Sequence, residues 1–302
     1  MTTGSASTTV FQGGKNVYGA AVGILMLETR FPRVDGDIGN AGTWPFPVMH
    51  RIVPGASPDR VVRLRAEGLL DDFISAGKDL IRHGADGIST NCGFLALFQD
   101  ELSAALAVPV ATSSLMQVPF VERLLPPGKR VGIITISAPS LTAEHLKGAG
   151  VAPETPIVGT ESGRHFSRAI LNNEAELDIE ASRLDLLDAG NSLLTQHDDI
   201  GAIVLECTNM VPYAADLPSP ADLVRRLKDG DAAPSGGTTS AAAPAGAPAV
   251  ATSTQASGQT PTVAPAAQLG VAPSPRMEEV AEAVPEAPRV EPFRAAVELA
   301  RV

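Results

Sequence analysis

Three nearly continuous apolar runs of strand length dominate this sequence, at residues 17–27 (VYGAAVGILML), 130–136 (RVGIITI) and 200–206 (IGAIVLE). Runs without polar alternation are typical of parallel strands that are buried on both faces of a sheet. Segments with helical periodicity separate them, and the longest are residues 58–83 and 174–197. Alternating buried strands and helices predict an α/β fold with parallel sheets and right-handed crossovers.

Shorter segments complete this pattern. The sequence predicts a polar, glycine-rich loop after the first strand. It also predicts further strands at residues 84–90, 108–111 and 155–159, and further helices at residues 94–107, 115–125 and 139–148.

The composition changes sharply near residue 231. Most residues of the segment 231–275 are Ala, Pro, Gly, Ser or Thr, and Asp231 is its only charged residue. Such a segment buries too little apolar surface to offset the entropy of ordering. We therefore expect a disordered start at residues 1–16, a first lobe at 17–125, a second lobe at 126–230 and a disordered low-complexity tail at 231–302.

Charge and cysteine content narrow the classes of partner. The net charge is −11, with 23 Lys and Arg against 34 Asp and Glu, which argues against a nucleic acid or an anionic membrane as partner. No apolar run reaches the roughly 18 residues of a membrane span. Two cysteines without a close histidine pair argue against a disulfide scaffold and against a zinc site, so we expect no bound metal. We expect a cytoplasmic protein, in which both thiols stay reduced.

Both cysteines are predicted to lie directly after the carboxyl end of a strand. Cys92 follows the strand that ends at Thr90, and Cys207 follows the strand that ends at Glu206. Ligands of α/β proteins bind outside the carboxyl ends of the strands, where helix N-termini offer free N–H groups. The two thiols are therefore expected to face one cleft between two similar lobes, with their sulfur atoms about 6–9 Å apart, within proton-transfer reach of one substrate carbon.

The segments 89–93 (STNCG) and 205–209 (LECTN) resemble the aspartate/glutamate racemase superfamily, over about residues 17–216. This resemblance implies two similar α/β lobes related by pseudo-twofold symmetry. It also implies cofactor-independent racemisation of a small carboxylic acid, an amino acid or a derivative, by proton transfer between Cys92 and Cys207. An isomerase of the racemase/epimerase type is the expected enzyme class.

Neighbouring residues are assigned around the two thiols. A thiol has an ordinary pKa near 8.5, so one member of a pair can serve as base and the other as acid. The substrate carboxylate is expected to meet groups at the two helix starts and in the loop after the first strand. These substrate-binding candidates are Asn91, Gly93, Thr208, Asn209, Thr29, Arg30 and Arg33, with Glu28 and His165 in support and His145 as a further possible lining residue.

Three departures from the family pattern leave alternatives open. Gly93 and Phe94 replace the Asn-Thr that usually follows the first cysteine, Asn209 replaces a usual His or Glu, and no strand is predicted after residue 228. An incomplete second lobe would leave an exposed sheet edge, which favours association into a homo-oligomer. The alternatives are a hydantoin racemase, a one-thiol decarboxylase of arylmalonate type, a maleate-type cis–trans isomerase, or an inactive relic with a truncated second lobe.

Overall fold

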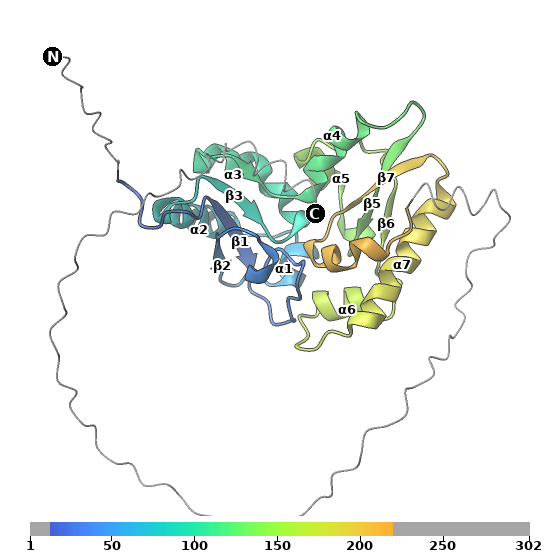
Figure 1. Ribbon diagram of the computed structural model, residues 1–302, viewed down its shortest axis with the longest axis horizontal. Coiled ribbons are helices and arrows are strands. Elements are labelled where there is room, and N and C mark those ends of the chain that lie inside the picture. Colours follow the sequence, from blue (N-terminus) through green and yellow to red (C-terminus); the bar gives the residue numbers. More distant parts are fainter. Residues whose placement is uncertain (1–12, 220–302) are drawn as a thin grey trace, which may run out of the picture. The chain divides into compact units, whose positions relative to one another are not determined.

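The computed structural model describes residues 13–219, which form two parallel β-sheets with helices packed against them (Figure 1). The α/β fold with two parallel-sheet lobes, expected from the sequence, is confirmed. The predicted disordered start is described only from residue 13, and the predicted tail at 231–302 lies outside the described residues. Within residues 13–219, no helix is long and apolar enough to cross a lipid bilayer.

The N-terminal lobe is built on a four-stranded sheet with the order β2-β1-β3-β4. Its parallel strands are β1 (Val22–Leu27), β2 (Val48–Val53), β3 (Gly87–Thr90) and β4 (Val110–Ala111). Helices α2 (Leu70–His83) and α3 (Gln99–Leu106) pack against this sheet. The central strand β1 is buried over its last five residues, as its continuous apolar sequence requires.

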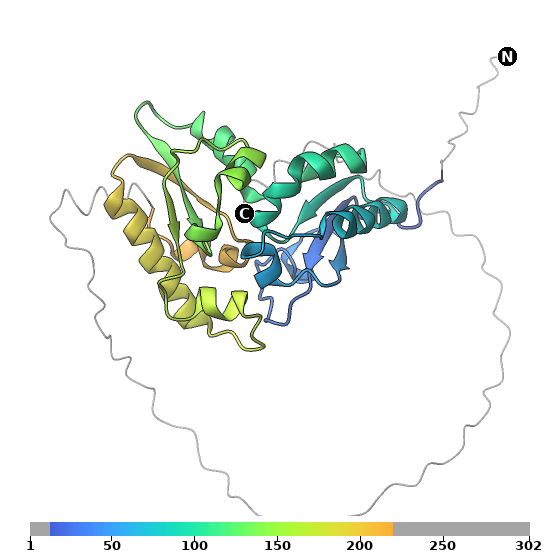
Figure 2. The ribbon, with the colours of Figure 1, turned by 180° about the vertical axis from the view of Figure 1, so that it is seen from behind.

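The C-terminal lobe is built on a three-stranded parallel sheet with the order β6-β5-β7. Its strands are β5 (Arg130–Thr135), β6 (Ile157–Gly159) and β7 (Ile200–Leu205). Helix α7 (Ile179–Gln196) packs along it, as Figure 2 shows from behind. In both lobes the central strand comes first in the chain and its two neighbours follow, so the sheets repeat one topology.

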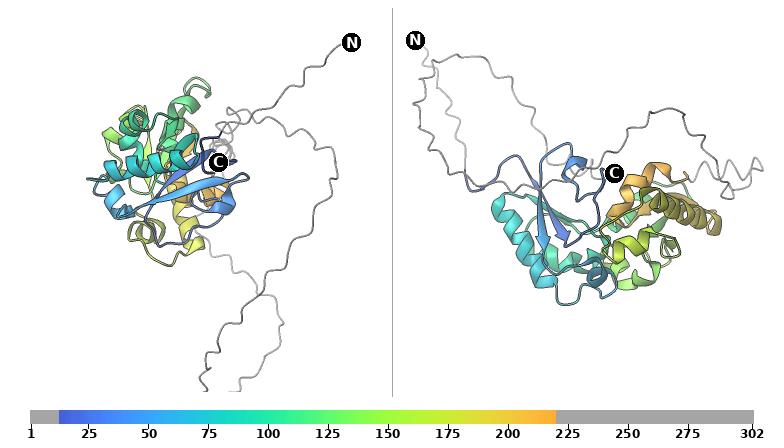
Figure 3. Two further views of the ribbon diagram at one scale, coloured as in Figure 1. Left: turned by 90° about the vertical axis from the view of Figure 1, so that its left-hand side faces the viewer. Right: turned by 90° about the horizontal axis from the view of Figure 1, so that it is seen from below.

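Short helices make the remaining connections (Figure 3). The short α-helices are α1 (Pro58–Val62), α4 (Val118–Glu122), α5 (Ala143–Gly148) and α6 (Phe166–Leu171). The 3-10 helices are η1 (Ala41–Thr43), η2 (Gly93–Phe98), η3 (Ser114–Gln117), η4 (Ala138–Ser140) and η5 (Thr208–Asp216). Several segments predicted as single helices thus begin with a 3-10 turn.

The two sheets differ at one edge. In the N-terminal lobe, β4 pairs with β3, whereas no strand of residues 13–219 pairs with the equivalent edge of β7. The chain after residue 219 lies outside the described residues. Over its described part, the second sheet is therefore one strand smaller than the first.

The helix predicted at residues 58–83 is two helices, α1 and α2. Arg65 and Ala66 lie between them in the left-handed region, with φ of 56° and 53°, through which an α-helix does not continue. The apolar spacing runs across this break because Val61, Leu69 and Phe73 are all buried. The prediction of one helix is wrong here because apolar spacing reports burial and not continuity.

Strand β2 lies where the sequence predicts a polar loop. It is an edge strand, and all its residues except Val53 are at least partly exposed, so it lacks the pattern of a central strand. The long second helix also begins later than predicted, at Ile179. There the side chain of Asp178 accepts a hydrogen bond from the backbone N–H of Ala181 and caps the helix.

Helices α5 and η2 bring the two lobes into close contact. Gly148 lies so near η2 that a Cβ atom there would be 2.1 Å from the carbonyl oxygen of Ala96. One turn earlier on α5, the ring of His145 packs edge-on against Phe94, with ring centroids 5.1 Å apart. Both contacts join the lobes beside the carboxyl end of β3.

The contact at Gly148 leads to a stability prediction. Gly148→Ala is expected to lower the free energy of unfolding by about 1–3 kcal/mol, because the new methyl group has to displace the backbone of η2. Urea denaturation followed by circular dichroism measures the change. Lys147→Ala, at an exposed position of the same helix, is the matched control. Equal stability of the two variants would show that the lobes do not meet as described.

A second prediction concerns acid stability. The Nδ1 atom of His145 accepts a hydrogen bond from the N–H of Thr142 at 3.0 Å, and its Nε2 atom is buried without a partner among the described residues. Burial, and then the charge of Arg65, lowers the pKa of His145 from 6.5 to about 4. The unfolded chain therefore binds this proton more readily, so the stability conferred by the neutral ring is present above pH 6.5 and disappears as the pH falls toward 4.

His145→Gln tests this link, because glutamine at the third helical position retains the capping geometry and does not titrate. Between pH 7 and pH 4, the wild type should lose up to about 3 kcal/mol more stability than the variant. Thermal or urea unfolding at a series of pH values provides the comparison. Parallel curves for the two proteins would contradict a buried, neutral His145.

Candidate active site

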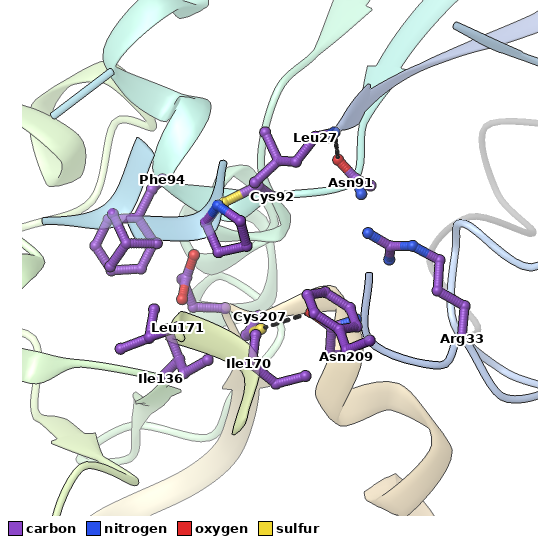
Figure 4. Close-up of a pocket in the computed structure, with 14 residues that line it drawn as sticks. Leu27, Arg33, Asn91, Cys92, Phe94, Ile136, Ile170, Leu171, Cys207 and Asn209 are labelled. Carbon is purple, nitrogen blue, oxygen red and sulfur yellow. Dashed lines mark hydrogen bonds between the residues drawn. The ribbon is translucent and has the colours of Figure 1, made fainter. Parts of the chain in front are cut away.

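The two cysteines occupy equivalent positions at the strand ends of the two lobes. Cys92 precedes η2, after β3, and Cys207 precedes η5, after β7, both in extended backbone conformation. Both side chains line one pocket, to which each lobe contributes walls (Figure 4). Parallel strands place their carboxyl ends at the same edge of each sheet, and this brings residues far apart in the sequence together.

The pocket is apolar with a few polar groups. Its apolar lining consists of Leu27, Phe31, Pro58, Val62, Phe94, Ile136, Ile170 and Leu171. Its polar lining consists of the two thiols and the side chains of Arg33, Asn91, Glu206 and Asn209. Among the described residues, no group of three or more His, Cys, Asp or Glu side chains is arranged to hold a metal ion. This combination is typical of a site for a small molecule.

Burial makes both thiols weak acids. For Cys92, burial and then the negative charge of Glu206 raise the pKa to about 12, against the opposing effects of the Phe94 N–H and of Arg33. For Cys207, burial and then the charges of Glu206 and of Cys92 raise the pKa well above its ordinary value. The Arg33 guanidinium opposes the shift at Cys92 and is not among the groups that act on Cys207.

Glu206 is a fully buried carboxyl group whose negative charge acts on both cysteines. Burial raises its pKa to about 7, although hydrogen bonds from Thr135 and from the Ile136 N–H act in the opposite direction. Its Oε2 atom accepts the Thr135 hydroxyl at 2.8 Å, while its Oε1 atom has no partner among the described residues. An unpaired buried carboxylate oxygen is costly, so a partner for this atom would be stabilising.

The carboxyl group of Glu206 also accounts for the absence of a side chain at position 93. A Cβ atom on Gly93 would lie 2.3 Å from Oε1 and 2.5 Å from the carbonyl oxygen of Glu206. No side chain fits there without moving Glu206. Gly93 therefore provides space rather than a substrate contact, and it does not belong to the pocket lining.

Asn91 and Thr208 connect the two strand ends. The Oδ1 atom of Asn91 accepts the N–H of Leu27 at 2.8 Å, and its buried Nδ2 atom has no partner among residues 13–219. The hydroxyl of Thr208 donates to the carbonyl oxygen of Asn91 at 2.8 Å. Asn91 thus presents a free amide N–H group to the pocket, whereas Thr208 joins the lobes and lies outside the lining.

A chain of polar contacts runs from Arg33 to Cys207. The Nη1 atom of Arg33 donates to Oδ1 of the buried Asp37 at 2.8 Å, and the guanidinium lies 4.9 Å from the ring centroid of Phe31. Asp37 accepts a hydrogen bond from the Nδ2 atom of Asn209 across the lobes. Asn209 in turn accepts the thiol of Cys207, with Sγ 3.6 Å from Oδ1. This chain orients Arg33 in the pocket (Figure 4).

Other residues predicted for the site lie outside the pocket lining. Glu28 is exposed and accepts the N–H of Gly55 at 2.8 Å, so it is not beside the first thiol. Arg30 is exposed. Thr29 accepts a hydrogen bond from Arg33 at 3.1 Å and so influences the pocket only through that side chain.

The two histidine candidates also serve the fold. The Nε2 atom of His165 accepts the N–H of Asp178 at 2.8 Å, next to the start of α7. His145 lies behind Phe94, which separates it from the pocket. Neither ring belongs to the pocket lining.

Sequence reasoning missed two site residues, Glu206 and Asp37. Glu206 is part of the second cysteine motif, but its position at the end of an apolar strand gives no sign of an unpaired oxygen. Asp37 lies in an Asp-Gly-Asp segment whose polar sequence predicts a solvent-exposed loop, yet its side chain is buried. A carboxylate directly before a strand-end cysteine was the available signal for Glu206.

Two curated relatives share a name. The chain is 27% identical over 214 residues to a dimethylsulfoniopropionate lyase of Durusdinium sp. clade D, covering 67% of this chain and 69% of that protein. It is 29% identical over 209 residues to dimethylsulfoniopropionate lyase 7 of Emiliania huxleyi, covering 64% of this chain and 60% of that protein. No family model matches the chain.

Similar solved structures include members of the superfamily that the cysteine motifs resemble. One is the aspartate racemase of Picrophilus torridus, which is 13% identical with a TM-score of 0.39, covering 70% of this chain and 95% of that chain. Another is unliganded arylmalonate decarboxylase, which is 14% identical with a TM-score of 0.41, covering 69% of this chain and 91% of that chain.

The relatives correct the expected reaction. The sequence led us to expect a racemase of the isomerase class that uses both thiols as acid and base. That expectation is wrong, because the curated relatives are named lyases. They favour the alternative that the sequence left open, in which other chemistry is performed with one thiol.

Proposed function

We propose that this chain is a carbon–sulfur lyase that acts on a small sulfonio carboxylate such as dimethylsulfoniopropionate. The observation that carries the proposal is one apolar pocket lined by two thiols and by a carboxyl group with a buried oxygen that has no partner within residues 13–219. The names of the relatives supply the reaction class and the substrate.

The proposed reaction is a β-elimination that needs one base. In a propionate with a dimethylsulfonium group on the β-carbon, a thiolate removes a proton from the α-carbon. The C–H electron pair forms the carbon–carbon double bond, and the carbon–sulfur bond breaks with its electrons on sulfur. The products are acrylate, neutral dimethyl sulfide and a protonated thiol, which returns its proton to solvent. No second group has to protonate the opposite face of the α-carbon, unlike in racemisation.

The carboxylate of the substrate has two donors within the pocket. Arg33 provides a guanidinium, whose planar geometry suits a carboxylate. Asn91 provides an amide N–H group without another partner among the described residues. Negative charge that spreads onto the carboxylate during proton removal is stabilised by the same two donors.

The sulfonium group suits the remaining walls of the pocket, which are apolar and carry the negative charge of Glu206. Its positive charge is attracted to the unpaired Oε1 atom of Glu206, and its methyl groups pack on apolar and aromatic side chains such as Phe94. A cation bound beside the thiols also favours their charged form, because an opposite charge lowers a thiol pKa. Substrate binding thereby offsets the high thiol pKa that burial imposes.

Cys92 is the proposed base. The charge of the Arg33 guanidinium favours its thiolate, whereas Cys207 donates its S–H hydrogen to Asn209. Cys92→Ser should therefore reduce dimethyl sulfide release by roughly 10²–10⁴-fold, the usual contribution of a general base. Cys207→Ser should retain activity within about tenfold of the wild type. Headspace gas chromatography measures dimethyl sulfide, and NMR measures acrylate.

Unchanged circular dichroism spectra and melting temperatures serve as the folding control for both serine variants. A larger loss in Cys207→Ser than in Cys92→Ser would reverse the assignment of the base. Absence of dimethyl sulfide from the folded wild type would refute the lyase and favour the inactive relic.

A separate prediction concerns recognition of the cation. At pH 8, where Glu206 is ionised, Glu206→Gln should weaken binding of 3-(trimethylammonio)propionate by about tenfold. Binding of the isostere 4,4-dimethylpentanoate, which keeps the carboxylate and lacks the cation, should not weaken by more than about twofold. Since the pKa of Glu206 is raised to about 7, the wild-type preference for the cation should fall as the pH drops below 7.

Isothermal titration calorimetry measures both ligands, which lack the sulfonium leaving group. Glu28→Gln, at an exposed carboxylate outside the pocket lining, is the matched control. Equal weakening of the ligand with the cation and the ligand without it by Glu206→Gln would assign Glu206 to packing rather than to cation recognition.

A further inference from the structure

Asp37 is a buried carboxylate whose two oxygens have different partners. Its Oδ1 atom accepts two donors, the Nη1 atom of Arg33 at 2.8 Å and the N–H of Gly39 at 2.7 Å. Its Oδ2 atom accepts the Nδ2 atom of Asn209 from the other lobe. Its side chain is only 3% exposed, so solvent does not replace these contacts.

These contacts determine which way the amide of Asn209 faces. An amide side chain has one donor end and one acceptor end. Because Asp37 can only accept a hydrogen bond, it holds the nitrogen of Asn209, and the oxygen is left toward Cys207. The Oδ1 atom of Asn209 lies 3.6 Å from the sulfur and accepts its S–H hydrogen.

We propose that Asp37 is a positioning residue that, by fixing the amide of Asn209, keeps Cys207 as a neutral hydrogen-bond donor and so gives the two thiols different roles. An acceptor oxygen stabilises S–H and repels a thiolate, whereas an amide N–H would do the reverse. The role of Asp37 in holding Asn209 and Cys207 does not depend on the proposed function. Only the assignment of proton abstraction to Cys92 rests on that function.

The charges around Cys207 act in the same direction. Glu206, Cys92 and Asp37 each disfavour a negative charge on its sulfur, and the backbone N–H of Asn209 is the opposing contact. Cys92 differs because the positive charge of Arg33 favours its thiolate. The asymmetry of the pair therefore comes from residues on both lobes.

The chain offers a direct measurement, because it has only two cysteines. In a full-length Cys92→Ser protein, Cys207 is the sole thiol, and its S–H stretching band in the infrared reports the hydrogen bond. Donation to Asn209 should lower the frequency of this band relative to a thiol that donates to nothing. Cys207→Ser, which retains only the Cys92 band, confirms the assignment.

Asp37→Asn is the decisive substitution. Two donors converge on the Oδ1 position, so the oxygen of the new amide stays there and its NH₂ group faces Asn209. The amide of Asn209 must then turn and present its own NH₂ group to Cys207. In the Cys92→Ser background, the S–H band should shift to higher frequency. Alkylation of Cys207 by iodoacetamide at pH 8 should become roughly tenfold faster, because the thiolate gains a donor.

A double-mutant cycle separates amide orientation from charge, since Asp37→Asn also removes a negative charge. With Asn209→Leu present, the Asp37→Asn change should leave the S–H band unmoved, because no amide remains to turn. Asp35→Asn is the matched control, an exposed carboxylate on the same loop that should leave the band at its wild-type position.

An unmoved band in Cys92→Ser/Asp37→Asn would overturn the proposal, and so would a shift that persists with Asn209→Leu. If Asp37→Asn does not fold, Asn209→Leu alone must shift the band to higher frequency, and an unmoved band there overturns the proposal as well. None of these measurements uses a substrate. Failure of the positioning role is therefore distinguishable from failure of the lyase activity.

Discussion

The buried carboxyl group of Glu206 lies with the buried thiol of Cys207 and the partly buried thiol of Cys92 where the carboxyl ends of β3 and β7 meet, and the electrostatics of the site follow from that arrangement. Burial is the largest cause that raises the pKa of Glu206 to about 7 and that of Cys92 to about 12, and the charge of Glu206 adds to the shift at Cys92. In the part of the chain that the structure describes, Arg33 is the only cationic side chain of the pocket lining, and Asp37 already binds it. The proposed substrate carries its own cation and would supply the positive charge that the pocket lacks.

Much of the fold could be predicted from the sequence, because central parallel strands are apolar on both faces. β1, β5 and β7 fall within the three apolar runs, and the cysteines follow β3 and β7. The edge strand β2 could not be predicted, because solvent contact breaks its apolar pattern. Nor could the break between α1 and α2, where Arg65 and Ala66 adopt left-handed backbone conformations that no local residue preference demands.

The site could be predicted only in part, for a related reason. Strand topology brings Cys92 and Cys207 to one pocket, and this depends on their positions at strand ends. The direction of each side chain depends on tertiary contacts that the sequence does not display. Thr208 turns toward a backbone carbonyl group, and Asp37 reaches across to Asn209. The motifs also could not separate a racemase from a lyase, because both reactions begin when a thiolate removes an α-proton.

The tight fit of Gly93 against Glu206 links the two halves of the site across more than a hundred positions of sequence. A side chain at 93 and a carboxylate at 206 would occupy the same space. The backbone carbonyl oxygen of residue 206 is also in the way, so a smaller side chain at 206 relieves only part of the clash. A homologous chain with a larger residue after its first cysteine must therefore also move the backbone before its second. The space at position 93 thus constrains the path of the chain into the second cysteine as well as the size of the side chain there.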